Sequence, residues 1–257
     1  MKEIVTLDGH KVPYVYSHPK NNAVGNIVLA HGITLDKNEY ENLFVNTQEF
    51  FINSGFNVVR FDFRGHGESK FPQEKMTIHG ESQDMKSICD YVEGLNDLPI
   101  FIVGCSFGAI STVIYSVSSE RVKGLVLWNP VLNIKSTFPC PETEWAKAFF
   151  TKEKILESKT TGFLYLGNYK VGNDLVNEML AFQLGDLIPE INVPVLIFHG
   201  DMDEIVPLRF TEEYYSKFKN CELIVLKGCG HGFLDKQIEV IKETCDWVLN
   251  KIELPQV

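Results

Sequence analysis

The sequence predicts an α/β fold with a mostly parallel central sheet flanked by helices. Two observations carry this prediction. Short, nearly continuous apolar runs rich in β-branched residues recur along the chain, as expected of parallel strands that are buried on both faces. Segments with helical periodicity lie between these runs, and this alternation implies right-handed crossovers. The length of 257 residues fits one α/β domain with a substantial core.

The expected strands follow one another at intervals along the chain. Residues 12–16 alternate apolar and polar side chains, which indicates an antiparallel strand at the start. The remaining strands are continuous apolar runs over residues 26–30, 58–63, 100–103, 124–128, 195–198 and 222–226. Most of these runs end at a turn that contains glycine or proline.

Helices are expected between the strands. Residues 81–94 show the pattern clearly, because their apolar side chains recur at the i, i+3, i+4, i+7 spacing of one helix face. These side chains are Met85, Ile88, Cys89 and Val92. Further helices are predicted over residues 40–53, 211–218 and 237–252, and directly after Gly108.

Residues 130–191 break the alternation of strand and helix. The segment is rich in charged, aromatic and turn residues, with helical patches at 142–150 and 173–184. We interpret it as an insertion over the carboxyl ends of the strands. The expected organisation is therefore a core made of residues 1–129 and 192–257, with a small cap formed by residues 130–191.

The composition limits the kinds of molecule that the protein is expected to bind. The net charge of -10 argues against nucleic-acid or anionic-membrane binding through bulk electrostatics. No secretory signal follows Met1, and no apolar run approaches the roughly 20 residues that span a bilayer. The six cysteines lack paired metal-ligand spacing, and no dinucleotide-binding glycine motif follows the first strand. We expect a cytoplasmic protein with reduced cysteines, no metal, no cofactor and no stable membrane insertion; a homodimer is left open.

The stretch Gly104–Gly108 reads Gly-Cys-Ser-Phe-Gly and joins an expected strand to an expected helix. A Gly-x-Ser-x-Gly turn in this position is typical of a nucleophile elbow. The turn is so tight that its serine takes a strained backbone conformation. Ser106 would stand at the start of the helix, whose free N–H groups can face a developing oxyanion.

A serine nucleophile needs a base, and the base needs an orienting carboxylate. His231 lies in a glycine-rich loop after the last expected strand. Asp201, Asp203 and Glu204 follow the preceding strand. The Asp-x-x-Val-Pro spacing favours Asp203, and the other two acids are the alternatives.

Other residues compete for these roles. The six further histidines are His10, His18, His31, His66, His79 and His199. The first two and His79 are expected at the surface, and the others are expected to have structural roles. Cys105 adjoins the nucleophile, but an elbow presents only its central residue, so we expect this thiol to pack in the core.

The chain resembles the α/β-hydrolase superfamily over essentially its whole length. Five blocks carry the resemblance: His31-Gly32, Asp62 to Ser69, Gly104 to Gly108, His199-Gly200-x-x-Asp203-x-x-Val206-Pro207, and Gly230-His231. Within the superfamily the chain is similar to bacterial cinnamoyl or feruloyl esterases and to monoacylglycerol-lipase-like hydrolases. The block from Asp62 and the size of the cap carry this narrower resemblance.

The resemblance implies roles for five residues. Ser106 would be the nucleophile, His231 the general base and then the general acid, and Asp203 the residue that orients the histidine. The backbone N–H groups of Ile33 and Phe107 would form the oxyanion hole. No metal or cofactor is implied.

Two positions depart from the feruloyl-esterase pattern. Phe107 stands where those enzymes commonly have Gln, and residues 132–143 offer no obvious Asp or Gln to hold a phenolic hydroxyl. The cap is nevertheless aromatic. We expect most of its aromatic side chains to form its own core and a few to face the substrate, with Phe138, Trp145 and Phe149 as candidates.

These observations favour a serine carboxylesterase that acts on small to medium esters through an acyl-enzyme, including hydroxycinnamate esters as candidate substrates. Monoacylglycerol lipase, thioesterase, proline-type aminopeptidase and acyltransferase activities use the same machinery and remain alternatives. A non-catalytic binding protein of the same fold is the rival from a different class. The presence of all three candidate residues, Ser106, Asp203 and His231, argues against it.

Overall fold

The computed structural model describes residues 2–253, and their central element is an eight-stranded sheet in the order β1-β2-β4-β3-β5-β6-β9-β10. The strands are β1 (Lys2–Val5), β2 (Lys11–Ser17), β3 (Gly25–Ala30), β4 (Phe56–Phe61), β5 (Ile100–Cys105), β6 (Val122–Trp128), β9 (Val195–Gly200) and β10 (Cys221–Leu226). The pairs β1–β2 and β2–β4 are antiparallel, and the other pairs are parallel. The predicted mostly parallel sheet is confirmed.

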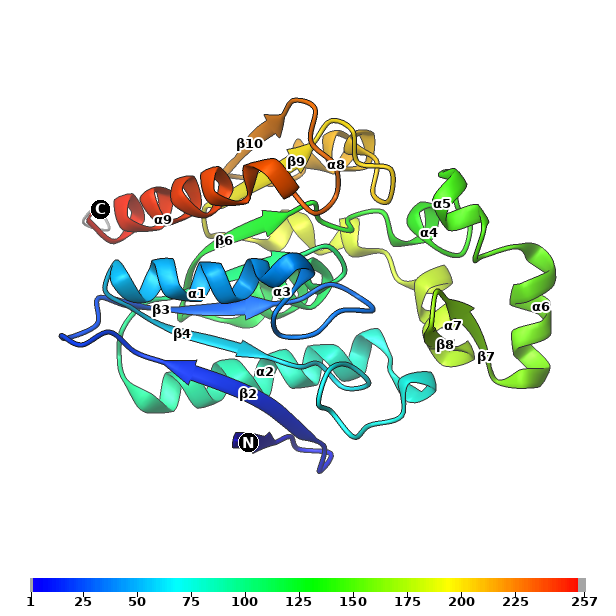
Figure 1. Ribbon diagram of the computed structural model, residues 1–257, viewed down its shortest axis with the longest axis horizontal. Coiled ribbons are helices and arrows are strands. Elements are labelled where there is room, and N and C mark those ends of the chain that lie inside the picture. The colour runs from blue at the N-terminus through cyan, green and yellow to red at the C-terminus, as the bar shows by residue number, and fades with distance from the viewer. Residues whose placement is uncertain (1, 254–257) are drawn as a thin grey trace.

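Helices cover both faces of this sheet (Figure 1). They are α1 (Leu43–Asn53), α2 (Ile78–Leu95), α3 (Gly108–Ser118), α8 (Leu208–Tyr215) and α9 (Gln237–Glu253). The helices α1 and α9 pack on one face, and α2 and α3 pack on the other. Short 3-10 helices are η1 (Tyr40–Asn42), η2 (Gln73–Lys75), η3 (Leu184–Asp186), η4 (Ile188–Glu190) and η5 (Leu234–Lys236).

The continuous apolar strands fill two hydrophobic cores. Successive side chains of a strand point to opposite faces of the sheet. In β3, Ile27 and Leu29 therefore join the core beneath α1 and α9, whereas Val28 and Ala30 join the core beneath α2 and α3. Burial on both faces explains why these strands show no polar alternation.

Strand register brings the loops that follow the parallel strands to one edge of the sheet. Ala30 of β3 lies opposite Gly104 of β5, and Cys105 of β5 lies opposite Trp128 of β6. Trp128 in turn lies opposite Phe198 of β9. The loops after these strands start side by side, which is where a ligand site is expected in an open α/β sheet.

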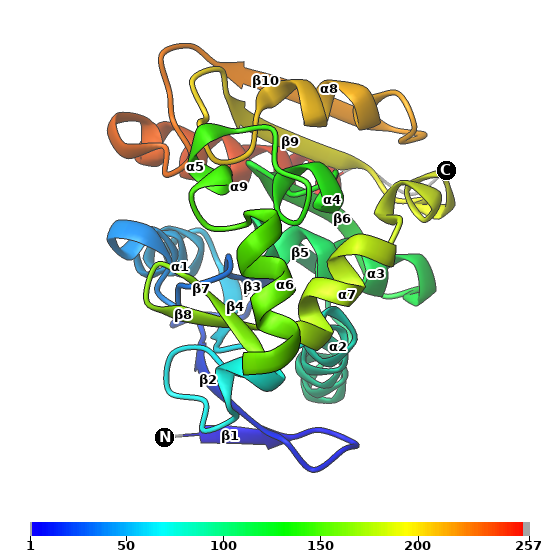
Figure 2. The ribbon, with the colours of Figure 1, turned by 90° about the vertical axis from the view of Figure 1, so that its right-hand side faces the viewer.

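Residues 130–191 are here called the cap segment, and its part from α4 (Ile134–Thr137) to α7 (Asn173–Ala181) lies over this edge (Figures 1 and 2). Its last part, with η3 and η4, runs back beside α3 toward β9. Between α4 and α7 the segment contains α5 (Glu144–Lys147), α6 (Lys152–Thr161) and the hairpin of β7 (Phe163–Leu166) and β8 (Tyr169–Gly172). Tyr169 stacks on the ring of His66 with 4.7 Å between centroids, and the Lys170 N–H donates to Gln73 Oε1 at 3.3 Å. These contacts join the hairpin to the segment that follows β4.

Several elements differ from the sequence prediction. The edge strand β1 was not predicted, because its side chains are mostly exposed and carry no apolar face. The predicted helix over 40–53 is divided, because Glu41 and Asn42 take left-handed backbone conformations before α1 begins. The helix α2 begins three residues earlier than predicted, where the Thr77 hydroxyl accepts a hydrogen bond from the Gly80 N–H.

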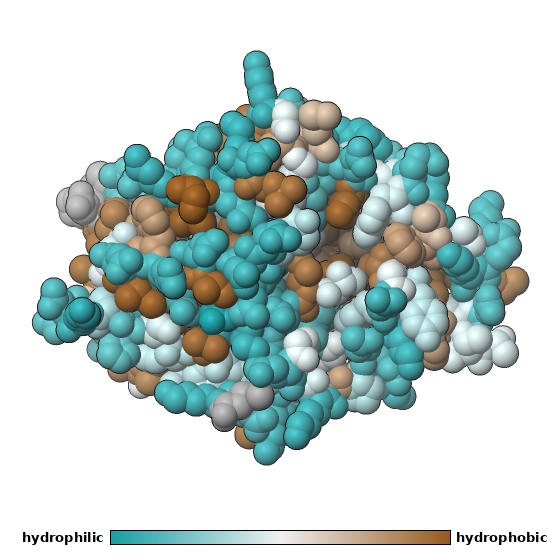
Figure 3. Space-filling model, in the orientation of Figure 1, coloured by the Kyte–Doolittle hydropathy of each residue, from teal (hydrophilic) through white to brown (hydrophobic). Residues whose placement is uncertain are grey.

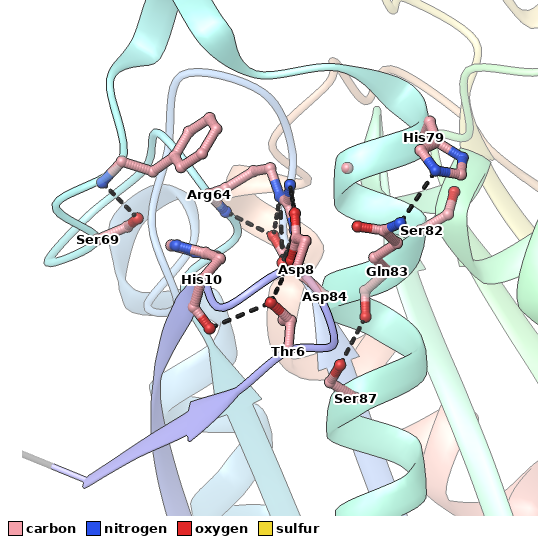
Figure 4. Close-up of polar contacts among 12 residues, drawn as sticks. Thr6, Asp8, His10, Arg64, Ser69, His79, Ser82, Gln83, Asp84 and Ser87 are labelled. Atoms are coloured by element: carbon pink, nitrogen blue, oxygen red, sulfur yellow. Dashed lines mark hydrogen bonds and ion pairs between the residues drawn. The ribbon is translucent and has the colours of Figure 1, made fainter.

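An ion-pair cluster joins the β1–β2 hairpin to the loop after β4 (Figure 4). The guanidinium of Arg64 contacts the buried Asp84 of α2 at 2.8 Å and Asp8 at 2.9 Å. Its hydrogen bonds lower the pKa of Asp8 to about 2. His10, expected at the surface, is instead half-buried with its ring against Phe71.

A second polar centre, the buried carboxylate of Asp62, joins the loop after β3 to the loop after β4. It accepts hydrogen bonds from the Lys37 backbone N–H, the Lys37 ammonium and the Glu68 N–H, at 2.8, 2.8 and 2.9 Å. Gly67 lies against this carboxylate with φ +50°, and a Cβ there would lie 2.3 Å from Asp62 Oδ1. The turn therefore requires glycine at this position.

None of the helices within residues 2–253 combines the length and the apolar character that a membrane-spanning segment needs.

We expect Gly67→Ala to lower the free energy of unfolding by at least about 2 kcal/mol, because it adds a left-handed penalty and displaces a buried, hydrogen-bonded carboxylate. Urea unfolding followed by circular dichroism measures this. Gly94→Ala is the matched control. Gly94 lies within α2 with open space around it, so alanine there should stabilise the protein by up to about 1 kcal/mol. Equal midpoints for Gly67→Ala and the wild type would contradict the expected cost.

Candidate active site

Ser106 occupies the turn between β5 and α3 with a φ of 51°, a left-handed conformation that is rare for serine. The turn is held close to its neighbours. A Cβ at Gly108 would lie 2.4 Å from the carbonyl oxygens of Ala30 and His31. The backbone of α3 thus approaches the end of β3 as closely as glycine allows, and this explains the second glycine of the motif.

Three side chains from separate loops form one hydrogen-bonded chain. His231 Nε2 lies 2.9 Å from Ser106 Oγ, and His231 Nδ1 lies 2.6 Å from Asp203 Oδ2. Because a neutral imidazole has one donor and one acceptor, the carboxylate at Nδ1 leaves Nε2 free to accept the serine proton. The structure therefore brings together the three residues that the sequence selected.

The alternative acids lie elsewhere. Asp203 is buried, and its second oxygen accepts hydrogen bonds from the Ile205 and Val206 N–H groups at 2.9 and 2.8 Å. Asp201 and Glu204 are exposed, and the Asp201 carboxylate accepts instead from the Gly228 N–H. The two backbone bonds hold the Asp203 carboxylate with one oxygen aimed at the imidazole.

The charge of the site favours a protonated histidine. Burial of the imidazole lowers the pKa of His231, but the negative charge of Asp203, its hydrogen bond and the charge of Glu39 outweigh burial and raise this pKa above its ordinary value. A base of this kind holds a proton well once it has taken it from serine.

Two backbone amides adjoin Ser106. The Phe107 N–H begins the turn into α3, and the Ile33 N–H follows Gly32, whose Cβ position would lie 3.0 Å from Ser106 Cβ. Neither N–H donates a hydrogen bond to another residue of the 2–253 range. Two free donors beside a nucleophile are suited to stabilising an oxyanion.

Two supporting residues were missed in the sequence. The Asn129 amide donates to the His231 carbonyl oxygen at 2.5 Å, and its oxygen accepts from the Gly200 N–H at 2.9 Å, so Asn129 holds the histidine loop. Glu39 Oε2 accepts from the Gly32 N–H at 2.7 Å. Both are single polar residues in loops, where the sequence has no periodic pattern that would identify them. For Asn129, its place directly after a strand was the one sequence feature that pointed to the site.

The remaining histidines near the site have structural contacts. His31 Nε2 accepts from the Phe63 N–H at 3.1 Å. His199 is buried, with Nε2 2.8 Å from the Val206 carbonyl oxygen and Nδ1 2.8 Å from the Thr211 hydroxyl. His66 is buried, with Nδ1 3.0 Å from the Arg64 carbonyl oxygen.

A pocket of about 430 Å³ opens at Ser106 between the cap segment and the sheet edge. In Figure 3 apolar side chains gather on the face between these two parts. The pocket wall is mostly apolar and includes Leu35, Leu43, Phe138, Trp145, Leu166 and Ile205. Phe138 and Trp145 thus lie where the sequence suggested. Phe149 does not line the pocket, because its ring packs edge-on against Trp145 at 5.4 Å.

Cys105 borders the same pocket, yet it is only 3% exposed and belongs to the core beneath α1 and α9. Burial raises the pKa of this thiol well above its ordinary value, so it stays protonated and a poor nucleophile. Within the described residues, no three His, Cys, Asp or Glu side chains converge to hold a metal ion.

Comparison with known proteins agrees with this architecture. The AB hydrolase superfamily protein YisY of Bacillus subtilis is 25% identical over 223 residues, which cover 73% of this chain and 79% of that protein. A monoglyceride lipase homolog of monkeypox virus is 22% identical over 276 residues, covering 96% and 97%. The structure of Est1E from Butyrivibrio proteoclasticus with ferulic acid bound superposes with a TM-score of 0.85 at 24% identity, covering 99% of this chain and 100% of that one.

The family model described as "Serine aminopeptidase, S33" matches residues 21–164. This range contains β3 to β6, the elbow and the first part of the cap segment. With its α/β-hydrolase fold, the chain belongs to this hydrolase family.

Proposed function

We propose that this protein is a serine carboxylesterase. The single observation that supports it best is the continuous contact from Asp203 through His231 to Ser106. Beside the serine lie two amides that have no acceptor among residues 2–253. A ligand-binding protein has no need of this chain of contacts, whereas acyl transfer needs each part of it.

In the proposed reaction His231 Nε2 takes the Ser106 proton as Oγ attacks the ester carbonyl carbon. The resulting oxyanion accepts hydrogen bonds from the Ile33 and Phe107 N–H groups. His231 then gives the proton to the departing alkoxide, which leaves as the alcohol and an acyl-enzyme remains. Water attacks the acyl-enzyme with the same base, and collapse of the second intermediate releases the acid and restores Ser106.

The apolar pocket supports esters with an apolar acyl or alcohol group of small to medium size, because ligand sites match the character of what they bury. Est1E, whose structure holds ferulic acid, shares the fold, and we carry hydroxycinnamate esters as one candidate class. The protein is proposed to act in the cytoplasm without a metal or cofactor, and to leave nucleic acid and membranes unbound.

Steady-state hydrolysis of a matched panel tests the proposal. The panel holds p-nitrophenyl esters of increasing acyl length, methyl ferulate, a monoacylglycerol, an acyl-thioester and a prolyl p-nitroanilide. Ser106→Ala should lower kcat by at least roughly 10³-fold on every substrate that the wild type turns over, because the nucleophile is lost. A folded wild-type protein that hydrolyses nothing in the panel would remove the esterase proposal and favour ligand binding.

The pH dependence should report the base. Only neutral His231 can accept the serine proton, and its pKa is raised in the folded protein. We therefore expect kcat/KM for p-nitrophenyl butyrate to fall toward acid with a midpoint above about 6.5, the ordinary value for histidine. Asp203→Asn should move this midpoint down and lower kcat by roughly 10³–10⁴-fold. A wild-type midpoint below the ordinary histidine value would contradict this electrostatic account.

Trp145→Ala should change acyl-length preference, because it removes an apolar pocket wall. We expect kcat/KM for short p-nitrophenyl esters to fall about tenfold and that for longer esters to fall less, as the enlarged pocket holds them better. Phe149→Leu is the control, because Phe149 contacts Trp145 and is not part of the pocket wall, and it should change the preference by less than about twofold. If both variants behaved alike, the assigned pocket wall would be wrong.

A further inference from the structure

Glu39 is an unusual residue for its place in the fold. It lies on the loop after β3 and borders the pocket at Ser106, and yet it is only 8% exposed. Its φ of 61° is unfavourable for a residue with a side chain. Burying a carboxylate and straining the backbone both cost free energy, so the contacts of this side chain must offset the cost.

Both carboxylate oxygens have defined partners. Oε2 accepts the Gly32 N–H at 2.7 Å, and Oε1 accepts the Tyr40 N–H at 3.2 Å. The Glu39 N–H donates to the Asp36 carbonyl oxygen at 2.9 Å, which holds the backbone from which the side chain extends. The carboxylate thus bridges the two ends of the loop that runs from β3 to η1.

The bond from the Gly32 N–H fixes the His31–Gly32 peptide. The following peptide, which carries the Ile33 N–H, is held by His31 Nδ1, which lies 2.8 Å from the Gly32 carbonyl oxygen. Gly32 lies directly against Ser106, and its own N–H is turned toward Glu39. Ile33 borders the pocket, and its N–H has no acceptor within the part of the chain that the structure describes. If the carboxylate were removed, the Gly32 N–H would lose its acceptor and the His31–Gly32 peptide would lose its anchor. Only the His31 contact to the Gly32 carbonyl oxygen would then hold the direction of the Ile33 N–H.

Glu39 also acts on His231 by charge. The titratable groups around the imidazole are Asp203, which is bonded to it, His199, which lies 3.6 Å from the Asp203 carboxylate, and Glu39 from the opposite loop. Burial raises the pKa of Glu39, and the hydrogen bond from Gly32 opposes that effect. The Glu39 charge is among the causes that raise the pKa of His231.

We propose that Glu39 is a positioning residue of the active site. It fixes the His31–Gly32 peptide, while His31 holds the Gly32–Ile33 peptide, so that the Ile33 N–H faces the reacting oxygen. Its carboxylate borders the same pocket as His231, where its negative charge favours the imidazolium. The inference rests on the proposed function, because it needs an oxyanion and a histidine base. It assigns to one buried acid two separable effects, one geometric and one electrostatic.

Two substitutions separate the effects. Glu39→Gln keeps an amide oxygen that can accept the Gly32 N–H and removes the charge. Glu39→Ala removes both. Glu41→Gln is the matched control, because Glu41 is an exposed acid two residues away, also with a positive φ. Each variant and the wild type are compared for kcat, KM and the pH dependence of kcat/KM with p-nitrophenyl butyrate, and for thermal unfolding.

The expected results differ between the variants. Glu39→Gln should keep its plateau kcat within about threefold of the wild type and move the acidic limb to lower pH, because His231 loses a stabilising negative charge. Glu39→Ala should lower kcat by roughly 10- to 100-fold with little change in KM, since a misdirected oxyanion donor weakens only the transition state. Glu41→Gln should match the wild type in both respects.

The inference is overturned if Glu39→Gln and the wild type share one pH profile and Glu39→Ala keeps its kcat, whatever happens to the melting temperature. A merely structural role would change melting alone. Labelling of Ser106 by a fluorophosphonate, followed by mass spectrometry, keeps the two proposals distinguishable. A wild type that neither hydrolyses esters nor labels refutes the proposed function and this inference together, whereas an active wild type with unaltered Glu39 variants refutes only the role of Glu39.

Discussion

The close backbone contact around Ser106 is the constraint on which the rest of the site depends. The Ser106 N–H donates to the Trp128 carbonyl oxygen at 2.9 Å, and the Ser106 carbonyl oxygen accepts from the Val131 N–H at 3.0 Å. Gly108 meanwhile presses against the end of β3. The elbow is therefore tied to both neighbouring strands. The loops after those strands supply the proposed oxyanion donor Ile33 on one side and the Asn129 bridge to the histidine loop on the other.

Hydrogen bonds to buried polar groups hold the three loops of the site in fixed conformations. Asp62 holds the Lys37 end of the loop after β3, and Glu39 holds the Gly32 end. Asn129 links β9 to the His231 loop. A buried ion pair such as Lys37–Asp62 adds little net stability once desolvation is counted. These buried bonds matter because each of them selects one conformation of its loop, and a preorganised site requires fixed loop conformations.

The sequence revealed what is encoded locally and missed what depends on packing between distant segments. Strands buried on both faces can be recognised as continuous apolar runs. The Gly-x-Ser-x-Gly turn can also be recognised locally, because its tight backbone requires glycine at two fixed positions. Asp203 could be preferred over its neighbours from spacing alone. Glu39 and Asn129 could not be found, because a single polar loop residue reveals neither its burial nor its partner. The sequence could not separate Phe149 from Trp145 for a similar reason. Both are aromatic residues of one short segment, and only the fold shows which of the two rings lines the pocket.

The pocket draws its wall from two sources along the chain. Phe138, Trp145 and Leu166 belong to the cap segment, whereas the proposed reacting groups, which are Ser106, His231, Asp203 and the Ile33 and Phe107 amides, all lie in loops that follow strands of the sheet. The cap segment therefore contributes part of the pocket wall and none of the proposed reacting groups. In the proposed esterase, substitutions of cap side chains can reshape the pocket and leave the hydrogen bonds from Asp203 through His231 to Ser106 in place. Substrate preference could then change while the reaction stays the same.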